Sequence, residues 1–169
     1  DPSLLYGEQK IIIENYIEKY ITNYTILRLG KIYGSKVGDG TMFTSWYHAI
    51  KTGVNEMTCT DDQYFSPIHY NDVSRVIKYV VHSKTQGIYN LGGPLNASRL
   101  DFLQIFLDEY GNNDLNITAC SIDSFNLPEK RPKDVSMDSS RIIHETQFTF
   151  KQPRDACREI IERGESNGK

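Results

Sequence analysis

The most informative part of the sequence is LLYGEQKIIIE, residues 4–14. Tyr6 and Lys10 are four residues apart there, so in a helix their side chains lie on the same face. A phenol can donate a proton, and a neighbouring ammonium favours the phenolate and so lowers the pKa of the tyrosine. Proton transfer is most efficient when the pKa of the donor is near the working pH. The pair is therefore a candidate acid with its own activating cation.

The spacing alone does not select this pair. Tyr47 and Lys51 stand at the same offset, and an exposed Tyr and Lys on an ordinary helix satisfy the same pattern. The residues that follow Tyr6 continue as a predicted helix to about Tyr20, with apolar residues at three- and four-residue spacing. We expect this apolar stripe to face the core; it consists of Ile13, Tyr16, Ile17, Tyr20 and Ile21.

Helical and strand patterns alternate along the rest of the chain, which predicts an α/β fold. Further helices are predicted over about 43–53, 73–82, 100–111 and from Gln152-Pro153 onward, and strands over 25–29, 56–60, 87–91 and 116–122, with an extended segment over 65–70. The strand at 25–29 is short and apolar, as in buried parallel sheets. Asn71 or Asp72 is expected to cap the helix at 73–82, and Ser98 with Asp101 forms a capping-box pattern.

Composition excludes several classes of protein. The 169 residues are 38% hydrophobic and 24% charged, with a formal net charge of -3, so a nucleic-acid partner is not expected. No apolar run reaches the roughly 20 residues that cross a bilayer, and no secretory signal peptide is present. The three cysteines contain no Cys-x-x-Cys pair and the histidines are scattered, which predicts no metal site and a reducing, cytoplasmic location.

A glycine-rich loop for a dinucleotide is missing from the sequence. No Gly-x-Gly-x-x-Gly follows a predicted strand, and Gly92-Gly93 is followed by Pro94. Such a loop normally holds the pyrophosphate of the cofactor at a helix N-terminus. We therefore expect this chain to be the C-terminal part of a longer protein, with the dinucleotide-binding part upstream, and to be inactive alone.

Four later segments are read together with the Tyr6 helix as one set of motifs: ILRLGKIYG (26–34), FSPIHYNDV (65–73), GIYNLGG (87–93) and RPKDVSMDSSR (131–141). Together with Tyr-x-x-x-Lys they resemble the extended short-chain dehydrogenase/reductase family over nearly the whole chain. The last segment is the most specific, and it resembles the dTDP-4-dehydrorhamnose reductase branch. The regulatory beta subunit of methionine adenosyltransferase belongs to that branch as well.

The resemblance implies how the chain is divided. The end of a Rossmann-type domain, about residues 1–34 and 66–92, is expected to interweave with a small α/β substrate-binding lobe, about 35–65 and 93–164. The 169 residues would then form one fragment.

The resemblance also implies roles for residues near the first helix. Tyr6 would protonate a sugar keto oxygen as a nicotinamide hydride reaches its carbon, and Lys10 would bind the nicotinamide ribose. Leu29, Gly30 and Ile32 would line the nicotinamide pocket. The cofactor would be NADP, or NAD, bound mainly by the upstream part. The catalytic Ser or Thr of the family would precede residue 1.

Three residues are candidates for binding substrate. Arg131 could pair with a nucleotide-sugar phosphate through its planar guanidinium, or serve as a surface or capping residue. Lys31 stands where many bacterial rhamnose reductases have an aromatic residue beside the sugar. Trp46 could stack on substrate or pack in the core. His69 and Asp138 are interpreted as structural, Asp138 as a helix cap.

The expected function of the complete protein is NAD(P)H-dependent reduction of a nucleotide-activated 4-keto-6-deoxy sugar. Two alternatives remain open at this point. One is a regulatory subunit that keeps the fold and binds a partner enzyme, and the other is a nucleotide-sugar epimerase or dehydratase. A homodimer is a further expectation for the enzyme.

Overall fold

The computed structural model describes residues 4–111 and 114–166 of the chain. The helices are α1 (Leu5–Tyr20), α2 (Met42–Lys51), α3 (Tyr70–Ser83), α4 (Arg99–Tyr110), α5 (Ser140–Thr146) and α6 (Pro153–Ser166), with a 3-10 turn at Ile122–Ser124. The strands are β1 (Thr25–Leu29), β2 (Ile32–Tyr33), β3 (Glu56–Thr60), β4 (Tyr64–Phe65), β5 (Ile68–His69), β6 (Gly87–Leu91), β7 (Ala97–Ser98), β8 (Asn116–Cys120) and β9 (Asp134–Val135). The α/β class predicted from the sequence is confirmed.

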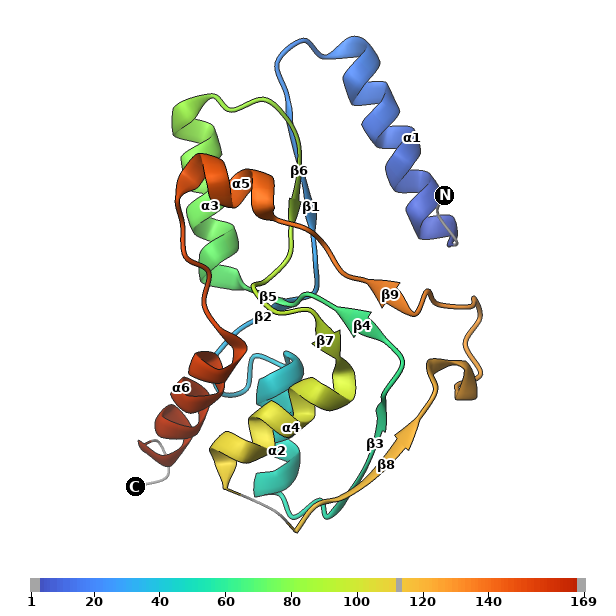
Figure 1. Cartoon of the computed structure of the whole chain (residues 1–169), viewed down its shortest axis with the longest axis vertical. Helices are drawn as coiled ribbons and strands as arrows, with labels where there is room; N and C mark the ends of the chain where they lie inside the picture. The colour runs from blue at the N-terminus through green and yellow to red at the C-terminus, as the bar shows by residue number, and fades with distance from the viewer. Residues whose placement is uncertain (1–3, 112–113, 167–169) are drawn as a thin grey trace.

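Strands β1 and β6, both predicted from the sequence, form a parallel pair in a register that runs from Thr25 opposite Gly87 to Leu29 opposite Leu91. Helices α3 and α5 lie on one side of this pair and α1 on the other (Figure 1). The core under α3 and α5 consists of Ile68, Val73, Val76, Tyr89, Leu91, Ile142 and Phe150. The end of β1 continues through Gly30 into β2, which pairs in parallel with β5.

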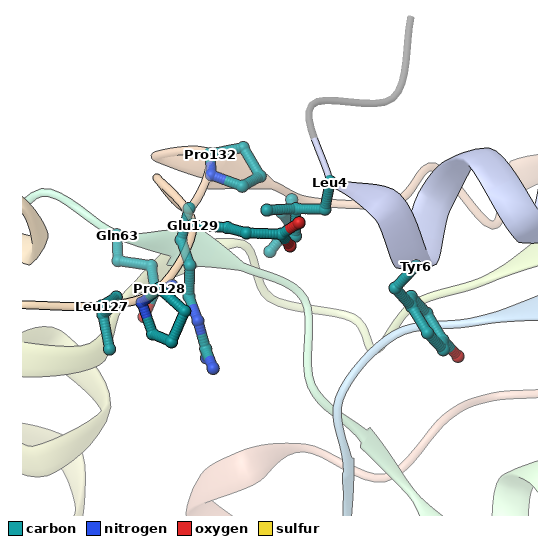
Figure 2. A pocket seen from close by; sticks show the side chains of 9 residues that line it. Leu4, Tyr6, Gln63, Leu127, Pro128, Glu129 and Pro132 are labelled. Carbon is teal, nitrogen blue, oxygen red and sulfur yellow. The ribbon is translucent and has the colours of Figure 1, made fainter.

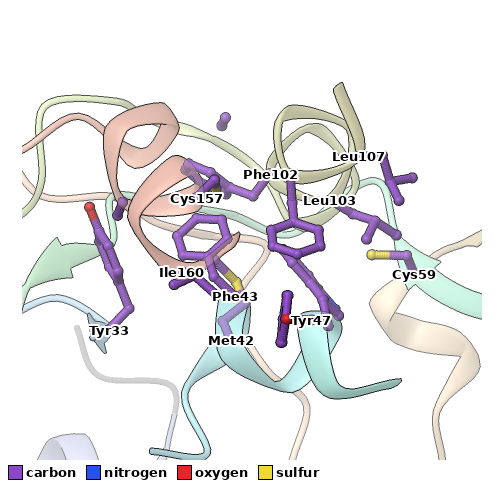
Figure 3. Packing of buried hydrophobic residues seen from close by; sticks show 14 of the residues in the cluster. Tyr33, Met42, Phe43, Tyr47, Cys59, Phe102, Leu103, Leu107, Cys157 and Ile160 are labelled. Atoms are coloured by element: carbon purple, nitrogen blue, oxygen red, sulfur yellow. The ribbon is translucent and has the colours of Figure 1, made fainter. Parts of the chain in front are cut away.

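A second and larger core lies between α2, α4 and α6. Phe43, Phe102 and Phe106 have no exposed surface. The rings of Phe43 and Phe102 pack edge-on against each other (Figure 3), and Phe106 is tilted against Trp46 and stacked on Tyr110. Full burial of such a side chain contributes about 1.5–3 kcal/mol. Strands β3 and β8 pair in parallel, and α4 packs against β3. This lobe is therefore held by its own hydrophobic core.

Helix α1 has the predicted length, but the prediction that its apolar stripe faces the core was wrong. No described residue of α1 is buried, and Tyr16 and Tyr20 are 61% and 58% exposed. The helix is tied to β1 by Glu14, whose carboxylate accepts hydrogen bonds from the Arg28 guanidinium. Periodicity identified an amphipathic helix, but it carries no information on whether a described element covers its apolar face.

The cap of α3 also differs from the prediction. The helix begins at Tyr70, and its first turn is capped by His69, whose Nδ1 accepts a hydrogen bond from the Asn71 amide at 3.2 Å. The buried Asp72 carboxylate instead accepts from the Lys151 amide at 2.8 Å and pairs with Arg75. The capping box of Ser98 and Asp101 at the start of α4 is confirmed.

Two segments cross closely between the cores. The Gly30 amide donates to the Leu91 carbonyl at 2.8 Å, and the Ile68 amide donates to the Lys31 carbonyl at 2.9 Å. A side chain at Gly93 would place its Cβ 1.8 Å from the Pro67 carbonyl oxygen, so only glycine permits this approach. Lys31 is thereby fixed at the junction between the β1–β6 pair and the lobe. The domain boundaries given above stay a prediction.

Candidate active site

Tyr6 and Lys10 lie on the first turns of α1, as their spacing predicted. The Lys10 ammonium is 5.1 Å from the centre of the Tyr6 ring, and Tyr6 is 66% exposed. Within residues 4–111 and 114–166, Lys10 forms no ion pair with a carboxylate. Its ammonium is therefore free to meet a ligand.

The structure also distinguishes this pair from Tyr47 and Lys51. The Lys51 ammonium is 5.7 Å from the Tyr47 ring, but Tyr47 is only 4% exposed. Its phenol packs against Gly164, where an added Cβ would meet the hydroxyl at 2.0 Å. Tyr47 is thus a core residue, and Tyr6 is the member of the two pairs that can reach a substrate.

A cavity of about 500 Å³ opens beside Tyr6. It is lined by Leu4, Tyr6, Gln63, Leu127, Pro128, Glu129, Arg131, Pro132 and Val135. Figure 2 shows Tyr6 on one side of the cavity and Gln63, Leu127 and Pro128 on the other. The fold has brought Tyr6 and Arg131, from distant parts of the sequence, to the walls of one cavity.

The wall opposite Tyr6 is held by the three-stranded sheet β7-β4-β9. The Tyr64 amide donates to the Lys133 carbonyl at 2.6 Å, and the Arg99 amide donates to the Gln63 carbonyl at 3.2 Å. The Leu5 amide, at the start of α1, donates to the Glu129 carboxylate at 3.4 Å. This last contact ties the loop that carries Arg131 to the helix that carries Tyr6.

The loop before β9 is braced by Asp62. Its carboxylate accepts from the Ile122 amide at 2.7 Å and pairs with the Lys133 ammonium at 2.6 Å. The hydrogen bond from Lys133, together with those from Ser121 and the Ile122 amide, holds the pKa of Asp62 well below its usual range. The charge on Asp62 therefore helps to fix one wall of the cavity.

Two cationic side chains, Lys31 and Arg99, lie over aromatic rings. The Lys31 ammonium is 5.8 Å from the centre of the Phe65 ring, and the Arg99 guanidinium is 5.5 Å from the Trp46 ring. Lys31 is exposed as a whole residue, yet desolvation of its ammonium lowers its pKa, and the charges of Arg99 and Arg131 lower it further.

The remaining predicted residues take different places. Leu29 and Ile32 are 40% and 41% exposed at the end of β1 and the start of β2, where they offer apolar surface on either side of Gly30. Trp46 is 4% exposed and packs edge-on against Phe43, so its ring belongs to the core of the lobe. It does not line the cavity with Tyr6, and a direct contact of Trp46 with substrate stays a prediction.

The residues interpreted as structural have structural contacts. His69 is buried, and burial followed by the charge of Lys151 lowers its pKa, so it caps α3 as a neutral ring. Asp138 accepts a hydrogen bond from the Ser140 amide at 2.9 Å, which is a structural contact, but the residue at the cap position of α5 is Ser139 rather than Asp138. Residues 1–3, which include Ser3, lie outside the described residues.

Sequence reasoning missed Gln63, Arg99 and Glu129. Gln63 stood in a predicted turn, and Arg99 lay within the capping-box pattern of Ser98 and Asp101, so each already had a local explanation. The signal that could have found them is long-range: Gln63 precedes β4 and Arg99 follows β7, and β4 pairs with both β7 and the strand that follows Arg131. Among the described residues, no group of His, Cys, Asp and Glu could hold a metal ion. None of the described helices is both long and apolar enough to cross a membrane.

The family model described as the RmlD substrate binding domain matches residues 1–166. The chain belongs to this family. It is 27% identical over 164 residues to the spore coat polysaccharide biosynthesis protein SpsK of Bacillus subtilis, a match that covers 96% of this chain and 55% of SpsK. The substrate-binding part expected from the four segments is thereby confirmed at the level of the family.

Solved structures share the fold. A dTDP-4-dehydrorhamnose reductase from Clostridium acetobutylicum superposes with a TM-score of 0.79 at 24% identity, over 98% of this chain and 57% of that one. A dTDP-4-dehydrorhamnose reductase from Bacillus anthracis, in complex with NADP, gives 0.80 at 20% identity, over 96% and 57%. The chain spans just over half the length of these relatives.

Proposed function

We propose that this chain supplies the acid and the substrate-binding wall of an NAD(P)H-dependent reductase that acts on a nucleotide-activated 4-keto-6-deoxy sugar. The observation that carries the proposal is the position of Tyr6 and Arg131 on one cavity. A phenol can protonate a ketone oxygen, and a guanidinium can bind a phosphate bidentately. Family membership and the reductases named above support the same reaction class.

Tyr6 is the proton donor in this proposal. Reduction of a ketone builds negative charge on oxygen, and a positioned acid relieves that charge as it develops. The phenol is exposed at the cavity, and the Lys10 ammonium over its ring places a positive charge beside it. When bound, a nicotinamide dinucleotide supplies the hydride.

The residues around α1 fit that cofactor in their chemistry. The Lys10 ammonium has no carboxylate partner in the described part of the chain. It can therefore donate hydrogen bonds to the hydroxyls of a ribose. Leu29 and Ile32 offer exposed apolar surface to a flat ring. Arg131 would hold the substrate by its diphosphate on the other wall, so that the sugar lies toward Tyr6.

The test uses the full-length protein with a nucleotide 4-keto-6-deoxy sugar and NADPH, and follows NADPH oxidation. Tyr6→Phe removes the proton donor and keeps the ring, so turnover should fall by about 10²–10⁴-fold with little change in cofactor affinity. Lys10→Met should reduce both turnover and cofactor binding, because one ammonium serves both.

Tyr16→Phe is the matched control, since Tyr16 is similarly exposed on the same helix and lies outside the cavity. Equal turnover of Tyr6→Phe and wild type would show that Tyr6 is not the acid. A wild-type protein without any turnover, whose partner enzyme is unaffected by Tyr6→Phe, would instead identify a regulatory subunit.

A further inference from the structure

The start of helix α1 has no cap from its own segment. Leu4 occupies the N-cap position, and its side chain accepts no hydrogen bond. Helices α3 and α4, in contrast, are capped by the residues directly before them, His69 and Ser98. At α1 the acceptor is the Glu129 carboxylate, which takes the Leu5 amide at 3.4 Å from 124 residues further along the chain. The free amides of a helix start favour such a negative charge.

Glu129 lies on a strap, residues 125–132, that is fixed at both ends and exposed between them. The bond from the Ile122 amide to Asp62 fixes its start, and the pairing of β9 with β4 fixes its end. Most residues of the strap are exposed. In the described part of the chain, the bond between Leu5 and Glu129 is the only hydrogen bond from the strap to an element other than the adjoining 3-10 turn.

The strap carries Glu129 and Arg131 as one stiff unit. Pro128 directly precedes Glu129, and Pro132 directly follows Arg131. Each proline fixes its own φ and restricts the backbone of the residue before it. Glu129 and Arg131 both line the cavity, whereas Lys130 between them is not among its lining residues. A contact that fixes Glu129 therefore also limits the movement of Arg131.

The cavity is the space between this strap and the start of α1. Five of its nine lining residues belong to the strap and two, Leu4 and Tyr6, to the start of the helix. Figure 2 shows the Glu129 side chain reaching from the strap toward Leu4. The spacing of strap and helix thus sets the distance between Arg131 and Tyr6, which are the proposed phosphate ligand and the proposed acid.

We propose that Glu129 is a positioning residue for the reduction. By binding the first amide of α1, it holds the strap and the helix at the spacing at which a substrate bound to Arg131 presents its ketone to Tyr6. The inference rests on the proposed function, and Glu129 takes no part in the proton transfer. A misplacement of ~1 Å can lower a rate about 10²-fold. The contact matters because no described residue of α1 is buried.

The experiment measures turnover and nucleotide affinity separately in the full-length protein. NADPH oxidation with a nucleotide 4-keto-6-deoxy sugar gives kcat, and calorimetry gives the affinity for dTDP or UDP, whichever the wild type binds more tightly. Glu129→Ala removes the acceptor and should lower kcat about 10–100-fold. The nucleotide affinity should stay within about threefold, because Arg131 is retained. Glu129→Gln keeps a carbonyl oxygen at the same reach and should restore kcat to within about threefold of the wild type.

Hydrogen exchange gives a readout that does not depend on turnover. The amides of Leu5 and Glu8 are both hydrogen-bonded at the start of α1. In Glu129→Ala they should exchange about threefold faster or more, as for the loss of an N-cap. Glu18→Ala makes the same truncation on the same helix outside the cavity, and it should leave both kcat and these amides unchanged.

Wild-type kcat in Glu129→Ala would overturn the inference and leave the proposed function standing. A loss in Glu129→Gln as large as that in Glu129→Ala would overturn it too, because the charge of the carboxylate would then act on the substrate directly. A fall in nucleotide affinity equal to the fall in kcat would make Glu129 a binding residue instead. If the wild type neither binds dTDP or UDP nor oxidises NADPH with the keto sugar, the proposed function itself fails, and this inference fails with it.

Discussion

Helices α1 and α4 are both rich in large apolar residues, but they differ in how much of this apolar surface is buried. Helix α4 buries Phe102, Leu103, Phe106 and Leu107, whereas no described residue of α1 is buried. Tyr6, the proposed acid, is thus carried by a helix held through polar contacts at Arg28 and Glu129. The substrate wall, in contrast, is built on a packed core. The two halves of one cavity therefore differ in how firmly the described residues hold them.

The largest effect that tests this comparison is on stability. Phe102→Ala removes a ring with no exposed surface and should lower the free energy of unfolding of the 169-residue chain by about 3–5 kcal/mol. Tyr16→Ala, on α1, should cost less than about 1 kcal/mol, because its ring is already 61% exposed. Urea denaturation measures both changes. Similar losses for the two variants would show that the face of α1 is covered in solution.

The contrast between the helices also explains what the sequence could predict. The strands at 25–29 and 87–91 were predicted because their apolar runs and flanking glycines are local signals, and the predicted length of α1 is also local. Which helix face is buried depends on elements distant in sequence. The periodicity of Ile13, Tyr16 and Tyr20 could not supply that.

The candidate site shows the same division. Tyr6 and Lys10 were found because one helix turn links them, and Arg131 because it begins a recognisable segment. Arg99 and Gln63 enter the site only through the pairing of β4 with β7 and β9, strands of two residues each. Such short strands leave almost no periodic pattern. The cavity wall that Gln63 and Arg131 supply could therefore not be predicted before the pairing was known.

An intermediate effect is expected at the loop that joins the two halves. Hydrogen bonds in the folded state stabilise the charged form of Asp62 and lower its pKa. Its contribution to stability is therefore present above the ordinary pKa of an aspartate. That contribution is lost as the pH falls through the lowered value. Asp62→Asn removes the charge at every pH, and the Ile122 amide should then exchange its hydrogen about tenfold faster at neutral pH. Hydrogen-exchange measurements test this, with Asp61→Asn as the neighbouring control.

Unchanged exchange at Ile122 in Asp62→Asn would mean that the loop is held by its other contacts. In that case the position of the wall that carries Arg131 would not depend on Asp62, just as the position of α1 does not depend on burial in the core.

The smallest effect concerns the tie between α1 and β1. The hydrogen bond from Arg28 lowers the pKa of Glu14, so the pair stabilises the fold above the ordinary pKa of a glutamate and less as the pH falls through the lowered value. Arg28→Gln should cost less than ~1 kcal/mol overall, because the Arg28 side chain is 45% exposed and water screens the pair. The pKa of Glu14, followed by NMR titration, should rise toward its ordinary value in the variant. Because α1 depends on few contacts, its amides should exchange faster in Arg28→Gln while those of α4 stay unchanged. Equal acceleration in both helices would show that α1 and the lobe unfold as one unit, and the contrast between the two halves of the cavity would then be one of exposure alone.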